Sequence, residues 1–70
     1  MAKQNHGNPV ILRRPEVQRR TGLSRSTIYN NVVAGTFPAP VAIGPRAVGW
    51  LEHEVSDWIR RQVAASRGAA

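Results

Sequence analysis

The 70-residue chain contains no cysteine and only four acidic residues. Without cysteine, disulfide bonds and thiolate zinc sites cannot stabilise it. No apolar run approaches the roughly 20 residues of a membrane-spanning helix, and the polar start MAKQNHGNP lacks the apolar core of a signal peptide. We therefore expect one domain in the cytoplasm. A domain of this length buries only ~60% of its unfolded surface, which argues against a large enclosed active site.

Basic residues far outnumber acidic ones. Lys and Arg total 10, the formal net charge is +6, and nine of the ten cations are arginine. Arginine presents a planar fork of donors that matches phosphate oxygens and the edge of guanine. This balance predicts a polyanionic partner, nucleic acid before membrane. A charged surface with no such partner is the plainer alternative.

Two short helices joined by a tight turn are predicted in the first half of the chain. The first covers residues 15–20 and begins with proline, which the first helical position tolerates. Gly22 supplies the left-handed residue that ends many helices. Ser24 is a good N-cap for a second helix over about 24–34, which Gly35 closes. Two helices around such a turn form a helix-turn-helix.

The second predicted helix has a composition that does not favour helix formation. In the stretch SRSTIYNNVVA most polar residues are average or poor helix formers. Ile28 and Val32 share an apolar face, with Tyr29 and Val33 flanking it. The polar side chains point elsewhere, and their composition favours hydrogen bonds to something outside the helix.

The second half of the chain predicts a hairpin and a third helix. Residues 41–43 and 47–50 are strand-like, and Gly44-Pro45-Arg46 between them is typical of a hairpin tip. An amphipathic helix follows over about 52–66. We expect a flexible arm over residues 1–9, a domain over 10–64 that begins with an extended lead-in at Val10, and a frayed tail over 65–70.

This order of elements predicts a mainly helical fold with a small β-hairpin wing, the winged helix-turn-helix. In that layout the second helix lies in the major groove of DNA and its early residues contact base edges. The residues expected to contact bases are Arg25, Ser26, Thr27, Tyr29 and Asn30. Those expected on the DNA backbone are Arg13, Arg14, Arg19, Arg20 and, at the wing tip, Arg46. Arg46 also suits the minor groove.

Residues 12–60 resemble the AlpA family of phage and prophage regulators, which are similar to the DNA-binding domains of MerR-type activators and phage excisionases. The matching segments are Glu16-Val17, TGLSRSTIY from Thr21, Gly35, Phe37-Pro38-Ala39-Pro40, GPRAVGW from Gly44, Glu54-Val55 and Trp58-Ile59. The resemblance implies a winged helix-turn-helix that binds DNA near mobile-element genes, as a transcription regulator or an excision factor. Asn30 stands where relatives often have a basic residue, which predicts a different base preference. Pro45 predicts a stiffer wing tip.

A few residues are of types that stack on bases, bind metals or catalyse hydrolysis. Trp50 and Trp58 suit base stacking but are expected in the core. His6 and His53 have no second ligand nearby in the sequence. Ser24, His53 and Asp57 are the residue types of a hydrolase triad, yet Ser24 is better explained as a helix cap. We predict no catalytic residue, metal or cofactor.

Three alternative functions stay open at this point. An excision factor would bend DNA and recruit an integrase, whereas a regulator would alter access of RNA polymerase. A protein-interaction adaptor would use the third helix. An RNA-binding protein is disfavoured because the major groove of A-form RNA does not admit a helix.

One DNA-bound module covers only ~600–1,000 Å² of protein surface. We therefore expect cooperative or weakly dimeric binding to double-stranded DNA in the nucleoid, and no membrane partner. The operator and the sign of regulation do not follow from the sequence.

Overall fold

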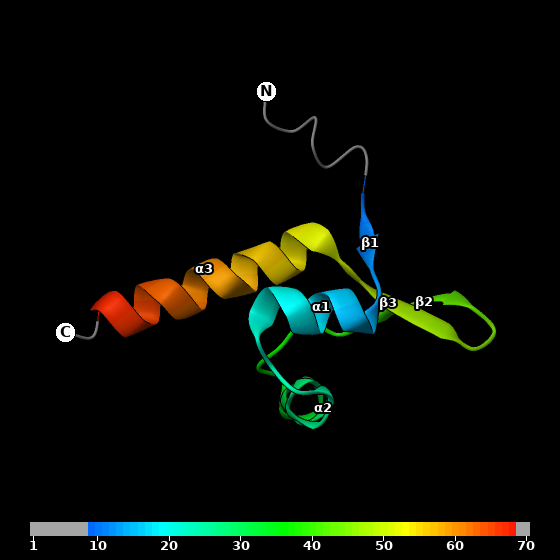
Figure 1. Cartoon of the computed structure of the whole chain (residues 1–70), viewed down its shortest axis with the longest axis horizontal. Helices are drawn as coiled ribbons and strands as arrows, with labels where there is room; N and C mark the ends of the chain where they lie inside the picture. The colour runs from blue at the N-terminus through cyan, green and yellow to red at the C-terminus, as the bar shows by residue number, and fades with distance from the viewer. Residues whose placement is uncertain (1–8, 69–70) are drawn as a thin grey trace.

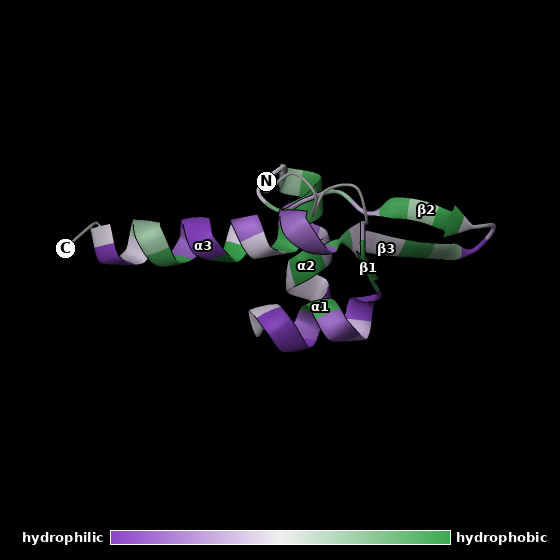
Figure 2. Ribbon diagram, turned by 90° about the horizontal axis from the view of Figure 1, so that it is seen from above, coloured by the Kyte–Doolittle hydropathy of each residue, from purple (hydrophilic) through white to green (hydrophobic). Residues whose placement is uncertain are grey.

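The computed structural model describes residues 9–68 and has three helices and three strands (Figure 1). The elements in chain order are β1 (Ile11–Leu12), α1 (Arg14–Thr21), α2 (Arg25–Ala34), β2 (Val41–Gly44), β3 (Ala47–Leu51) and α3 (Glu52–Gly68). The β2–β3 hairpin and α3 extend in opposite directions from the body, and α2 is oriented crosswise to them, so that it is seen end-on in Figure 1 (Figures 1 and 2). The prediction of a mainly helical fold with a β-hairpin wing is confirmed.

Two glycines end the first two helices. Gly22 and Gly35 have φ angles of 77° and 81°, in the left-handed region where a side chain is disfavoured. The Gly22 N–H donates to the Gln18 carbonyl at 2.8 Å, which satisfies one of the last carbonyls of α1. Only three residues separate α1 from α2, so the predicted helix-turn-helix is confirmed.

A short strand completes the sheet around β3. The strand order is β1-β3-β2, all antiparallel, with Ile11 opposite Leu51 and Val41 opposite Gly49. The lead-in was predicted to be extended, but its pairing with β3 was not predicted. A Cβ at Gly49 would clash with the Ile11 side chain and lie 3.0 Å from the Leu12 carbonyl oxygen. Glycine therefore lets β1 close over the base of the wing.

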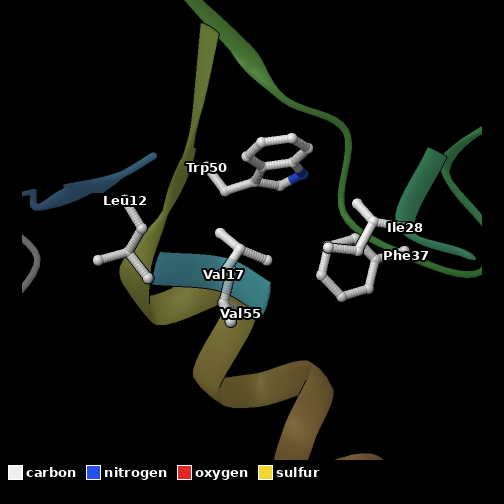
Figure 3. Close-up of a cluster of buried hydrophobic side chains, with 6 residues drawn as sticks. All are labelled: Leu12, Val17, Ile28, Phe37, Trp50 and Val55. Carbon is white, nitrogen blue, oxygen red and sulfur yellow. The ribbon is translucent and has the colours of Figure 1, made fainter. Parts of the chain in front are cut away.

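The core is a single cluster to which every element except β2 contributes (Figure 3). Its buried side chains are Leu12, Val17, Ile28, Phe37, Trp50 and Val55. The Trp50 indole N–H donates to the Pro38 carbonyl at 2.8 Å. Trp58 packs against the same cluster and donates to the Thr36 carbonyl at 2.7 Å. Trp50 is therefore a core residue, as predicted, whereas Trp58 is only partly buried at the edge of the core.

The third helix is longer than predicted. It begins at Glu52, as expected, but continues to Gly68, and residues 60–68 are all exposed. The C-terminal part of α3 therefore projects past the body (Figure 1). Fraying of residues 65–70 stays a prediction, and residues 1–8 and 69–70 lie outside the described part. No helix within residues 9–68 has both the length and the apolarity to cross a bilayer.

Candidate nucleic-acid interface

The start of α2 is fixed by a side-chain cap. The Ser24 hydroxyl oxygen accepts the Thr27 backbone N–H at 3.1 Å and the same hydroxyl donates to Thr27 Oγ1 at 3.0 Å. Ile28 is fully buried one residue later. The predicted cap is confirmed, and the hydroxyl of Thr27 is partly occupied by it. Cap and buried anchor together set which side of α2 faces outward.

The outward side of α2 forms a continuous row, which we call the outer stripe. It consists of Ser26, Tyr29, Asn30 and Val33, spaced i, i+3, i+4 and i+7, and all four are exposed. Arg25 lies beside it at the first turn and is exposed as well. The side chains of Arg25, Ser26 and Asn30 make no hydrogen bond to any other residue within 9–68. Their donors and acceptors are free for an external ligand.

Val33 was placed wrongly by the sequence pattern. It was expected to flank the buried face of α2, but 88% of its surface is exposed. Its spacing of seven from Ser26 puts it at the end of the outer stripe. That spacing was the available signal, and it was missed because valine is usually assigned to the core.

Tyr29 was expected both to flank the apolar face of the second helix and to contact DNA. Its ring meets Trp50 edge to face, with centroids 6.1 Å apart and an interplanar angle of 61°. Tyr29 as a whole is 36% exposed, and its hydroxyl has no hydrogen-bond partner within the described residues. The packing of the ring is shown. The contact of Tyr29 with DNA stays a prediction.

Two of the arginines expected on the DNA backbone are held in ion pairs. Arg19 pairs with Glu16, and Arg20 lies 2.9 Å from Glu16 Oε2 and 2.8 Å from Glu52 Oε2. The second contact links α1 to α3 across 32 positions of sequence. The carboxylates therefore offset much of the positive charge of these two arginines.

The other backbone candidates have no carboxylate partner among residues 9–68. Arg13 Nε donates to the Val48 carbonyl at 3.1 Å, which ties the start of α1 to the wing. Arg14 Nη1 donates to Gln18 Oε1 at 2.6 Å. Arg46 is exposed at the hairpin tip and has no partner in the part of the chain that the structure describes. Arg13, Arg14 and Arg46 therefore keep unneutralised charge.

The candidates for metal binding and for catalysis were His6, His53, Ser24 and Asp57. His6 lies outside the described residues, and within 9–68 no three His, Asp or Glu side chains approach closely enough to hold a metal. The Ser24 hydroxyl is used by the helix cap.

Removal of the cap is expected to destabilise the fold without touching the outer stripe. We predict that Ser24→Ala lowers the free energy of unfolding by about 1 kcal/mol, because the Thr27 N–H loses its partner. Urea denaturation followed by circular dichroism measures this. Ser26→Ala makes the same chemical change at an exposed position with no internal bond and should leave stability unchanged. Equal losses for both variants would contradict the role of the cap.

Comparison with known proteins places this interface in a family. The family profile described as "Prophage CP4-57 regulatory protein (AlpA)" matches residues 10–63. An uncharacterized protein, ORF88 of Enterobacteria phage P4, is 45% identical over 57 residues, which cover 81% of this chain and 65% of that protein. The chain thus spans just under two thirds of the phage protein. The DNA-binding transcriptional activator AlpA of Escherichia coli (strain K12) is 36% identical over 58 residues, covering 74% of this chain and 83% of the activator. The resemblance expected from the sequence is confirmed, and the chain belongs to the AlpA family.

Proposed function

We propose that this protein is a sequence-specific regulator of transcription in a phage or other mobile element and that it binds double-stranded DNA through α2 and the wing. One observation carries the proposal: the outer stripe and Arg25 present polar groups that no residue of the described chain satisfies. The E. coli relative, named as a DNA-binding transcriptional activator, supports the same function. A phage protein among the relatives supports the mobile-element setting.

In the proposed complex, α2 lies in the major groove, which is wide enough for one helix. Arg25 and Asn30 are the residues suited to two-pronged contacts, arginine with guanine and asparagine with adenine. Tyr29 presents its free hydroxyl, and Val33 its methyl groups, farther along the same stripe. Ser26 adds a short donor and acceptor. Thr27 is a weaker candidate because the cap already uses its hydroxyl.

The proposed backbone contacts are unequal in strength. Arg46 at the wing tip reaches a phosphate or the minor groove, and Arg13 and Arg14 hold phosphates beside α1. Arg19 and Arg20 contribute less because both already pair with carboxylates. Such contacts fix the register of the protein on the duplex, whereas α2 supplies the sequence preference.

Loss of the wing cation is expected to weaken binding to all sequences. We predict that Arg46→Ala reduces the slope of log K against log salt concentration by about 0.9, the value for one released counterion. Fluorescence anisotropy with a labelled duplex over a range of salt concentrations measures the slope. Arg19→Ala removes the same charge from an ion-paired position and is expected to change the slope less. An unchanged slope for Arg46→Ala would remove Arg46 from the phosphate contacts.

Selection from random duplex DNA at near-physiological salt tests the proposed function. We expect a short enriched motif. Salt-sensitive binding without enrichment would mean that only the backbone is recognised, and it would favour the adaptor function. Equal or better binding to structured RNA would contradict recognition of duplex DNA.

An excision factor would use the same interface differently. It must bend its site so that an integrase can act, and a bend costs energy that depends on sequence. The printed name of the E. coli relative favours regulation of transcription. Gel mobility of duplexes with the site at different positions separates the two functions, because a strongly bent complex would favour the excision factor.

A further inference from the structure

A groove of about 670 Å³ lies between α3 and the segment that joins α2 to β2, and the proposed DNA interface does not use it. One wall is the segment 35–41, and the other is formed by Glu54, Asp57, Trp58, Arg61 and Gln62 of α3. Trp58 is held in the α3 wall by two contacts. Its ring packs edge to face on Phe37, with ring centroids 4.9 Å apart, and its indole N–H donates to the Thr36 carbonyl. The α3 wall of the groove is therefore centred on a fixed aromatic ring.

Two unpaired charges of opposite sign flank that centre. Asp57 is paired with Arg60, but neither Glu54 nor Arg61 forms an ion pair or hydrogen bond within residues 9–68. Both line the groove. Seven residues separate them, which is two helical turns, or about 10.5 Å along the axis of α3. They lie on the same side of the helix, one before Trp58 and one after it.

This arrangement is self-complementary. If two copies of α3 lie antiparallel about a two-fold axis beside Trp58, Glu54 of one copy faces Arg61 of the other, and the symmetry repeats the pair. Antiparallel helices also place their dipoles favourably. We propose that two copies of this chain associate through the α3 wall of the groove, with one Glu54–Arg61 ion pair on each side of the two Trp58 rings. This association does not depend on DNA.

The charges favour a second copy over a different partner. A cationic peptide in the groove would meet Arg61, and an anionic one would meet Glu54. A second copy supplies both charges in reverse order at the required spacing. The association is expected to be weak, because exposed ion pairs contribute little individually. If the proposed function also holds, two-fold pairing predicts inverted rather than direct repeats in the bound DNA.

Charge reversal and remixing test the pairing in the absence of DNA. Glu54→Arg and Arg61→Glu each place like charges opposite one another, so each is expected to weaken self-association at least about tenfold. An equimolar mixture of the two variants restores it to near the wild-type level. In that mixture the introduced arginine faces the introduced glutamate, and the native Arg61 of one chain faces the native Glu54 of the other. Sedimentation equilibrium at low salt and concentrations up to millimolar measures all four samples.

Arg67→Glu is the matched control, since it reverses a charge of α3 that does not line the groove; it is expected to associate like the wild type. Circular dichroism confirms that each variant is folded. Three results would overturn the pairing: a wild-type chain that stays monomeric at millimolar concentration, single reversals without effect, or a mixture that associates no better than its components. Both reversed variants should still select the wild-type DNA half-site, so failure of pairing and failure of DNA recognition are separable.

Discussion

Asn30→Ala is expected to lower the affinity for the preferred duplex by about 1–3 kcal/mol and to leave the affinity for a scrambled duplex unchanged. The Asn30 side chain is exposed in the middle of the outer stripe and has no hydrogen bond within the described chain. Its removal therefore breaks no hydrogen bond in the free protein, and the loss of affinity arises in the complex. Anisotropy titrations of both duplexes at one salt concentration measure the difference.

Asn31→Ala is the matched control for that experiment. It makes the same chemical change one position along α2, but residue 31 is partly buried and lies off the outer stripe. We expect both duplexes to bind Asn31→Ala as they bind the wild type. If Asn30→Ala instead weakens preferred and scrambled duplexes equally, Asn30 touches the DNA backbone and not a base edge. The next selection experiment would then focus on Arg25.

The elements that local chemistry specifies were predicted well. Gly22 and Gly35 end helices because their left-handed backbone is costly for other residues, and Ser24 begins one because its side chain bonds within the next turn. Each of these signals acts over a few residues. The helix-turn-helix and the hairpin followed from such signals, so the sequence was sufficient to place them.

Features that depend on distant residues were not predicted. The strand β1 has only two residues, and its pairing depends on Gly49 leaving room for Ile11, which no local pattern indicates. Likewise, the pairing of Arg20 with Glu52 joins positions 32 residues apart. From composition alone, every arginine counts as a cation available to bind phosphate. The structure shows which arginines already pair with a carboxylate and which do not. The division of the basic surface into strong and weak phosphate candidates therefore needed the tertiary structure.

The candidate site was predicted mostly from residue type, and its geometry refined the set. Tertiary packing decides which side of α2 faces outward, so Val33 joined the outer stripe and Thr27 became a partner in the cap. Both changes arise because Ile28, buried at the core, sets the rotation of the helix. The contacts with DNA themselves remain predictions.

Trp50→Ala is expected to cause the largest loss of stability, about 3–5 kcal/mol. Trp50 is among the largest fully buried side chains, and its indole N–H holds the Pro38 carbonyl at 2.8 Å. A 70-residue domain has only about 3.5–10 kcal/mol in total, at ~0.05–0.15 kcal/mol per residue. The variant should therefore lose most of its cooperative unfolding transition. Urea denaturation followed by far-ultraviolet circular dichroism measures it.

Trp50→Phe separates stability from the recognition surface. Phenylalanine keeps an apolar ring but leaves the Pro38 carbonyl without its donor, so the expected loss is smaller, about 1–3 kcal/mol. Because Tyr29 rests edge-on against Trp50, the smaller ring also removes part of the support beneath the outer stripe. We expect this folded variant to bind the preferred duplex more weakly than the wild type, because Tyr29 is less well supported.

A Trp50→Ala variant as stable as the wild type would show that the core is not organised around Trp50. Wild-type DNA affinity in folded Trp50→Phe would show that Tyr29 holds its position without the indole.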